Sequence, residues 1–188
     1  MKRYYLIIKF LSVLFFLSSC AFVPKPNYFI PTKKVETGLD ILNSSDFNSI
    51  SGKRIGLITN QTGINKSLTH NIELFHKSLN IELKAIFSPE HGFEGTEDAG
   101  EKILNSYDGD TGLTFYSLYN ETKKPTSEML KDIDVLVFDI QDLGIRSYTY
   151  ISTLGLAMEA AAENNIEFLV LDRPNPFGGN RVEGNILD

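Results

Sequence analysis

Acidic, amide and hydroxyl side chains gather at four places in this sequence of 188 residues, each directly after an apolar run that is typical of a buried strand. In open α/β sheets, ligands bind beyond the carboxyl ends of the strands, where side chains that follow different strands meet. We therefore expect the four clusters to form one polar row at one edge of a sheet. The clusters are Asn60-Gln61-Thr62, Ser88-Pro89-Glu90-His91-Gly92, Asp139-Ile140-Gln141-Asp142 and Asp172-Arg173-Pro174-Asn175.

Glu90 is the centre of this row, because its loop is shaped on both sides. Pro89 restricts the backbone before it, and Gly92 and Gly95 permit unusual backbone angles after it. Such a loop suits a carboxylate that must be held in one place for acid–base chemistry. His91 could tune or orient that carboxylate, or it could be a polar loop residue without a chemical role.

Three of the clusters also have a purely structural interpretation. Asn60 could cap a turn, Asp142-Leu143-Gly144 could form one, and Pro174-Asn175-Pro176 could be a rigid loop. This interpretation weakens for the clusters taken together, because they follow four separate predicted strands.

Other kinds of site are poorly supported. His70 and His76 are six residues apart on a predicted helix and do not share a face, so we expect both to be solvated, and with no Cys/His cluster a zinc site is not favoured. The sequence contains no Gly-x-Ser-x-Gly elbow, and no Gly-x-Gly-x-x-Gly follows the first predicted strand. We expect neither a metal nor another cofactor.

The elements that must position the polar row alternate regularly. We expect strands at residues 54–60, 83–88, 113–118, 135–140 and 167–172, and helices at 68–79, from 125, and at 148–165. In the first helix, Leu68, Ile72, Phe75 and Leu79 are predicted to share the buried face. Apolar strands that alternate with amphipathic helices predict an α/β fold with a Rossmann-like, doubly wound and mostly parallel sheet.

Residues 1–19 predict a lipoprotein signal peptide. Lys2 and Arg3 precede an apolar run that ends at Leu17-Ser18-Ser19-Cys20, which is similar to a bacterial lipobox. Cys20 is then the lipid attachment site of a protein exported and anchored to an envelope membrane, at its periplasmic or outer face. The alternative is an ordinary signal peptide with an incidental thiol. Residues 20–38, which hold three prolines, are predicted to be a tether, and residues 39–188 a folded domain.

The charge balance argues against nucleic acid as a partner. The sequence has 24 acidic against 18 basic residues, and the predicted leader contains only basic ones. The mature protein is therefore acidic, whereas nucleic-acid binding depends on Lys and Arg that neutralise phosphates.

In their order along the chain, the motifs closely resemble the exo-β-N-acetylmuramidase family of glycoside hydrolases, long catalogued only as a domain of unknown function. The resemblance covers residues 52–188. It rests on Gly56-Leu57-Ile58-Thr59-Asn60-Gln61-Thr62-Gly63, on Phe87-Ser88-Pro89-Glu90-His91-Gly92-Phe93 with Asp98-Ala99-Gly100, on Tyr116-Ser117-Leu118-Tyr119 with Lys124-Pro125-Thr126, on Asp139-Ile140-Gln141-Asp142-Leu143-Gly144 with Arg146 and Tyr148-Thr149-Tyr150-Ile151, and on Leu171-Asp172-Arg173-Pro174-Asn175-Pro176 with Gly178-Gly179 and Val182-Glu183-Gly184.

The resemblance implies an exo-acting enzyme that removes terminal N-acetylmuramic acid from the non-reducing ends of peptidoglycan fragments, in cell-wall turnover and recycling. Members of the family continue into a second, smaller subdomain, and their active site lies in the cleft between the two. We therefore expect residues 39–188 to be the N-terminal, catalytic domain, truncated before that subdomain.

Glycosidases of this kind generally use two carboxyl groups. Glu90 is the expected acid or acid/base, assisted by His91. The second group stays open among Asp139, Asp142, Asp172 and Glu183, with the acetamido group of the substrate as a third possibility.

Substrate binding is expected from the rest of the row. Arg146 and Arg173 suit the lactyl carboxylate of muramic acid, and Tyr148 could stack on the sugar, whereas Tyr150 is expected to pack in the core. The remaining candidates for hydrogen bonds to the sugar are Asn60, Gln141, Asp172 and Asn175. The alternative functions are a lipid-anchored module that binds muropeptides or other sugars without cleaving them, and a metal-dependent hydrolase.

Overall fold

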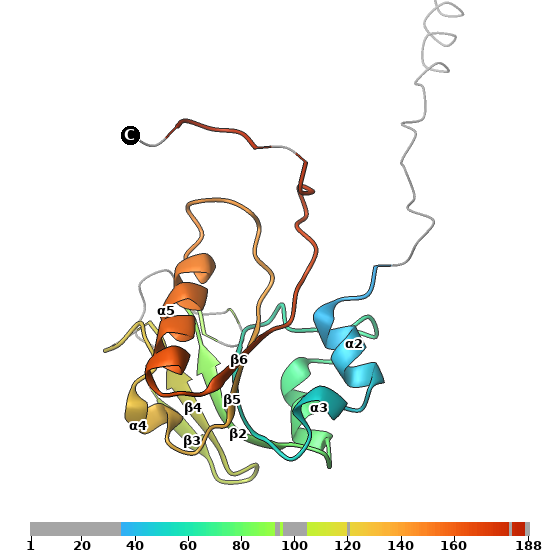
Figure 1. Cartoon of the computed structure of the whole chain (residues 1–188), viewed down its shortest axis with the longest axis vertical. Helices are drawn as coiled ribbons and strands as arrows, with labels where there is room; N and C mark the ends of the chain where they lie inside the picture. Colours follow the sequence, from blue (N-terminus) through green and yellow to red (C-terminus); the bar gives the residue numbers. More distant parts are fainter. Residues whose placement is uncertain (1–34, 93–94, 96–104, 120, 181, 187–188) are drawn as a thin grey trace, which may run out of the picture. The chain divides into compact units, whose positions relative to one another are not determined.

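The computed structural model describes residues 35–92, 95, 105–119, 121–180 and 182–186 (Figure 1). The predicted signal peptide, with Cys20, lies outside the described residues, and so does most of the predicted tether. The same holds for Asp98-Ala99-Gly100.

The core of the fold is a six-stranded sheet with the order β3-β4-β2-β1-β5-β6. All neighbours pair in parallel except β3, which runs antiparallel to β4. The order of the parallel strands reverses between β1 and β5, as in a Rossmann-like fold. The strands are β1 (Arg54–Thr59), β2 (Glu82–Ser88), β3 (Ser106–Asp108), β4 (Leu113–Ser117), β5 (Val135–Asp139) and β6 (Glu167–Val170).

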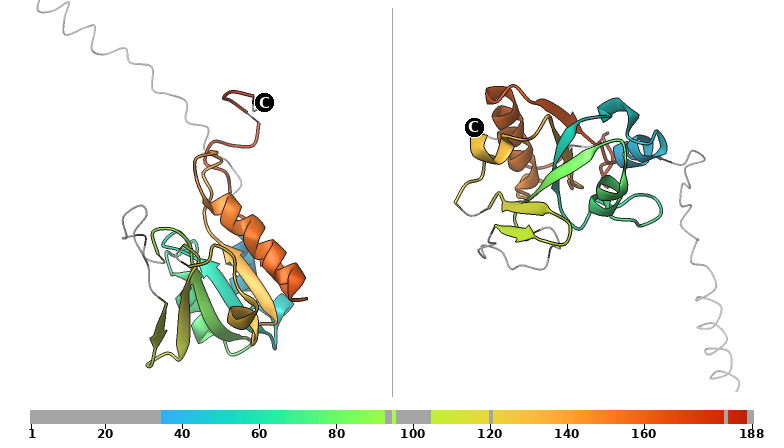
Figure 2. Two further views of the ribbon diagram at one scale, coloured as in Figure 1. Left: turned by 90° about the vertical axis from the view of Figure 1, so that its left-hand side faces the viewer. Right: turned by 90° about the horizontal axis from the view of Figure 1, so that it is seen from below.

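Helices cover both faces of the sheet (Figures 1 and 2). On one face, β1 and β5 contribute Leu57 and Val137 to an apolar layer with α2 and α3. On the other face, the next residue of each strand, Ile58 and Phe138, packs against α4 and α5. The doubly wound α/β prediction is therefore confirmed. The helices are α2 (Gly38–Ser44), the short 3-10 helix η1 (Asn48–Ile50), α3 (Asn71–Lys77), α4 (Ser127–Leu130) and α5 (Tyr150–Glu163).

The prediction of a helix over residues 68–79 is wrong at both ends. Leu68 has a positive φ of 61° and is 78% exposed, and Leu79 is fully exposed. The Asn65 side chain accepts hydrogen bonds from the backbone N–H groups of Ser67 and Thr69, both at 2.9 Å, and so holds residues 65–69 in a turn. Only Ile72 and Phe75 of the expected apolar face pack toward the core.

The prediction that His70 is a solvated helix residue is wrong, because His70 is the N-cap of α3. Its Nδ1 accepts the backbone N–H of Ile72 at 3.2 Å, and its Nε2 lies 3.0 Å from the carbonyl oxygen of Asn60. The imidazole therefore links the start of α3 to the end of β1. This contact matters for the site, because Asn60 begins the polar row.

Candidate functional site

At the carboxyl end of the sheet, where the strand order reverses, the protein fills the space with its own side chains. The Asp139 carboxylate accepts from Arg173 Nε at 2.6 Å and Nη2 at 3.0 Å, and from Asn71 Nδ2 at 2.7 Å. Arg173 also donates to the carbonyl oxygen of Ile64, at 3.2 and 3.3 Å. Asp139 is fully buried and Arg173 is 7% exposed at its side chain. We therefore infer that the pair stabilises the fold, rather than serving as a catalytic carboxylate and a lactyl-binding arginine.

Asn60 is also buried at this end of the sheet. Its Oδ1 accepts from the backbone N–H of Thr62 at 3.0 Å and from the Thr62 hydroxyl at 2.6 Å. The Thr62 hydroxyl oxygen in turn accepts the backbone N–H of Gln141 at 2.9 Å, which ties the end of β1 to the segment after β5. This geometry matches the turn-capping interpretation of Asn60, and its contact with substrate stays a prediction.

Glu90 lies in the loop that follows β2, two residues beyond the end of the strand. The turn is closed by the backbone N–H of Gly92, which donates to the carbonyl oxygen of Pro89 at 3.2 Å, and His91 adopts a positive φ of 70° within it. The side chain of Glu90 is half-buried, and its Oε2 accepts the hydroxyl of Thr149 at 3.1 Å. The loop therefore holds a carboxylate that is supported by the protein and still open to a ligand.

A second hydroxyl, from Tyr119 just beyond β4, reaches the same carboxylate. The hydrogen bond to Glu90, together with burial and the negative charge of Glu90, raises the pKa of Tyr119 above its ordinary value. Glu90 thus receives hydrogen bonds from two hydroxyls: Tyr119 follows β4, and Thr149 precedes α5.

Glu90 opens into a hollow of about 490 Å³. Gly95 belongs to its wall, and the Gln61 side chain packs so closely on this glycine that a Cβ atom would overlap it. Tyr148 is 40% exposed at this hollow, whereas Tyr150 is only 8% exposed, as its predicted core position requires. The lining residues are Gln61, Glu90, His91, Gly95, Ser147, Tyr148, Thr149 and Tyr150.

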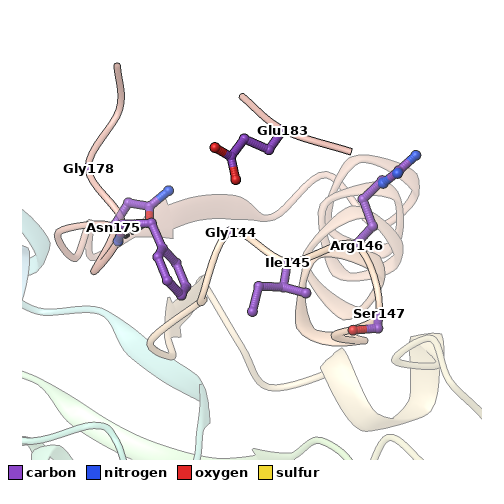
Figure 3. A pocket seen from close by; sticks show the side chains of 8 residues that line it. Gly144, Ile145, Arg146, Ser147, Asn175, Gly178 and Glu183 are labelled. Atoms are coloured by element: carbon purple, nitrogen blue, oxygen red, sulfur yellow. Dashed lines mark hydrogen bonds between the residues drawn. The ribbon is translucent and has the colours of Figure 1, made fainter. Parts of the chain in front are cut away.

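A second hollow of about 590 Å³ lies between the loop after β5 and the segment after β6 (Figure 3). In Figure 3 the Glu183 carboxylate is turned toward the side of Asn175, whereas the Arg146 side chain extends away from it. Ser147 lines both hollows, so they are neighbours. The lining residues are Gly144, Ile145, Arg146, Ser147, Asn175, Phe177, Gly178 and Glu183.

Gln141 and Asp142 hold the loop between the hollows. Gln141 Nε2 donates to the carbonyl oxygens of Asp142 at 2.7 Å and Pro174 at 2.9 Å, which clamps the segments after β5 and β6 together. Asp142 Oδ1 accepts the backbone N–H of Gly144 at 2.6 Å, whereas Oδ2 is buried and makes no hydrogen bond with the described part of the chain. Asp172 has an exposed side chain, and its carbonyl oxygen accepts the N–H of Gly38 at 2.9 Å.

The structure thus separates the predicted site residues. Asn60, Asp139 and Arg173 are buried in the network at the reversal of the strand order. Glu90, His91 and Tyr148 line one hollow, and Arg146, Asn175 and Glu183 line the other, whereas Gln141, Asp142 and Asp172 line neither. Tyr119 and Thr149 were missed as site residues. Tyr119 could have been found by the same rule as the others, because it follows the strand that ends at Ser117.

Within the described residues, no three or more His, Cys, Asp or Glu side chains are grouped so as to hold a metal ion. None of the helices within the described ranges is long and apolar enough to cross a membrane.

A Rossmann-like domain with a supported carboxylate beyond its strands is a common arrangement in enzymes of many classes, and comparison with known proteins supplies the family. Residues 55–188 match the family model described as exo-beta-N-acetylmuramidase NamZ, N-terminal. This match spans well over half of the chain, and the chain belongs to that family.

The chain is also similar to individual proteins. It is 54% identical over 155 residues to the peptidoglycan beta-N-acetylmuramidase NamZ of Bacillus subtilis, and the aligned region covers 82% of this chain and 37% of the relative. It is also similar to crystal structures of two DUF1343 family proteins from Bacteroides fragilis. One has a TM-score of 0.73 at 54% identity, covering 81% of this chain and 38% of that one. The other has a TM-score of 0.67 at 36% identity, covering 83% and 39%. The chain therefore spans less than two fifths of the length of these relatives.

Proposed function

We propose that the protein to which this chain belongs is an exo-acting glycoside hydrolase, which removes N-acetylmuramic acid from the non-reducing ends of peptidoglycan fragments. The observation that carries the proposal is Glu90, a half-buried carboxylate in a hollow of about 490 Å³ with hydroxyl donors around it. The family, and the Bacillus subtilis relative that is named a peptidoglycan beta-N-acetylmuramidase, support the reaction and the substrate class.

In this proposal Glu90 protonates the glycosidic oxygen that leaves. The other carboxyl group of the reaction comes from Glu183, which lines the second hollow, or is replaced by the acetamido group of the substrate. Asp139, Asp142 and Asp172 are weaker candidates: the first is bound by Arg173 and Asn71, and the other two line neither hollow.

Recognition of the sugar is assigned to the exposed side chains around Ser147. Arg146 is exposed beside the second hollow and suits the lactyl carboxylate, since a guanidinium can donate two parallel hydrogen bonds to a carboxylate. Tyr148 can stack on the sugar ring from the first hollow, and Asn175 can donate to a hydroxyl or acetamido group from the second.

The test uses the product of the complete reading frame that contains this chain, with a disaccharide that carries N-acetylmuramic acid at its non-reducing end. We expect release of free N-acetylmuramic acid, its loss in Glu90→Gln, and its retention in Glu128→Gln, which changes an exposed glutamate of α4. Unfolding in urea must be unchanged in both variants.

Three outcomes would contradict the proposal. Near-normal turnover in Glu90→Gln would remove Glu90 as the acid. Sugar binding measured by calorimetry with no product after long incubation would favour the binding module, and loss of activity in chelator would favour the metal-dependent hydrolase.

For the location of the protein, we propose export and attachment to the envelope membrane through lipid on Cys20, which places the enzyme where cell-wall fragments are turned over and recycled. The support is the lipobox-like sequence Leu17-Ser18-Ser19-Cys20 after a basic and apolar leader. Fractionation of cells tests this: Cys20→Ser should move the protein out of the membrane fraction. If it stays there, Cys20 is not the anchor.

A further inference from the structure

Thr149 occupies the position of a helix cap without making the hydrogen bond of a cap. It is the N-cap residue of α5, a helix of 14 residues, and its side chain accepts no backbone N–H of the first turn. Threonine at this position ordinarily stabilises a helix through that bond. Here the hydroxyl donates to Glu90 Oε2 at 3.1 Å, across 59 residues of sequence.

At the starts of α2, α3 and α4, the N-cap side chain accepts a backbone N–H of the first turn. Thr37 accepts the N–H of Asp40, His70 accepts that of Ile72, and Thr126 accepts that of Met129. These three caps have an extended backbone, whereas the backbone of Thr149 is already helical, with φ −84° and ψ −12°. The Thr149 hydroxyl is therefore not placed to cap α5, and it donates to the carboxylate of Glu90.

The contact joins two segments that otherwise depend on separate elements. Glu90 belongs to the loop after β2, whereas Thr149 ends the loop that runs from β5 past both hollows, through Ser147 and Tyr148. A hydroxyl bound to Oε2 restricts the rotation of the carboxyl group. The Tyr119 hydroxyl approaches the same carboxylate from the end of β4.

We propose that Thr149 is a positioning residue for the acid of the reaction: its hydroxyl holds the Glu90 carboxyl group in the orientation that the leaving oxygen requires, in place of capping α5. The inference rests on the proposed function for its kinetic part. It assigns a role to a residue that touches the acid and not the reacting atoms.

The experiment compares Thr149→Val, which keeps the shape of the side chain and removes the hydroxyl, with Thr149→Ser, which keeps the hydroxyl. In Thr149→Val we expect kcat to fall about tenfold or more with KM within about twofold, and the urea midpoint to stay unchanged, because no cap bond is lost. Thr149→Ser should restore kcat. The matched control is Thr126→Val, which removes a real cap from α4 and should lower the urea midpoint without changing kcat.

Unchanged kcat in Thr149→Val overturns the inference, and so does a loss of kcat that Thr149→Ser does not restore or that parallels a loss of stability. If the wild-type protein shows no turnover, the proposed function is rejected and not the role of Thr149. The contact between Thr149 and Glu90 is then tested through the ¹³C carboxyl resonance of Glu90, which is identified by its loss in Glu90→Gln. That resonance should move in Thr149→Val and not in Thr126→Val; a resonance that stays in place overturns the claim.

Discussion

The Asp139 carboxylate and the Arg173 guanidinium lie side to side, joined by hydrogen bonds of 2.6 and 3.0 Å, at the end of the sheet where the strand order reverses. In open α/β sheets this crevice is where ligands commonly bind. Here a buried ion pair fills it, and the hollows that remain lie to either side of the loop through Ser147.

Removal of one partner of this pair is expected to destabilise the protein strongly. In Arg173→Met the Asp139 charge stays buried and loses two of its donors, so the free energy of unfolding should fall by about 3–5 kcal/mol. Urea unfolding measures the loss. The control is Lys53→Met, which breaks the exposed pair between Lys53 and Glu167 and should cost less than about 1 kcal/mol. A stable Arg173→Met protein with weakened sugar binding would instead support the lactyl-binding role.

Gly95 is expected to tolerate no side chain. It has a positive φ of 70°, and an added Cβ would overlap the Gln61 side chain. Gly52 has a similar φ of 74° with open space around it, so Gly52→Ala isolates the backbone cost, about 1–2 kcal/mol. Gly95→Ala should lose about 1–3 kcal/mol more in urea unfolding and should lower turnover, since Gly95 lines the Glu90 hollow.

A double variant separates the two causes. In Gly95→Ala with Gln61→Ala the overlap disappears, and the extra loss of stability should shrink toward the Gly52→Ala value. Equal losses in Gly95→Ala and Gly52→Ala would mean that Gln61 moves aside at no cost.

The pair between Arg54 and Asp134 predicts a pH-dependent contribution to stability. Hydrogen bonds from the Arg54 side chain and backbone lower the pKa of Asp134 from 3.8 to about 2. Because the folded pKa is the lower one, the contribution is fully present above pH 3.8 and is lost as the pH falls toward about 2. Asp134→Asn should therefore be less stable than wild type at pH 5, and the difference should shrink at pH 2. Urea unfolding at both pH values checks this.

Asp132 gives the matched comparison for Asp134. It contacts Arg54 once, at 3.2 Å, and its side chain is 71% exposed. Asp132→Asn should change stability little at either pH. A stability difference for Asp134→Asn that is the same at pH 5 and pH 2 would show that the ion pair does not cause it.

Much of the fold could be predicted because each strand carries its own signal. Val135–Asp139 is buried along its whole length, and such continuous apolar runs, alternating with helices, indicate a parallel sheet covered on both faces. The apolar periodicity gave a wrong start for the first predicted helix, because a turn precedes α3. Leu68 fits the apolar repeat of α3, yet the side chain of Asn65 binds two backbone N–H groups and delays the start of the helix.

The candidate site was harder to predict, because sequence position gives the edge of the sheet but not the partner of each side chain. Asp139 is the last residue of β5 and Glu90 follows β2, and a carboxylate at either place can face a ligand or a guanidinium. Arg173 is 34 residues beyond Asp139, and only the packed structure brings the two together. The same holds for Thr149, whose place before a helix predicts a cap and gives no indication of the contact with Glu90.

The antiparallel strand β3 has a consequence for solubility. It has three residues, and the last of them, Asp108, accepts the backbone N–H of Asp110 and the hydroxyl of Thr111, which turns the chain directly after the strand. A short edge strand is a poor template for another chain to add to the sheet. The β3 edge thus disfavours aggregation by strand addition, even though the largely buried strands β1 and β5 lie further inside the same sheet.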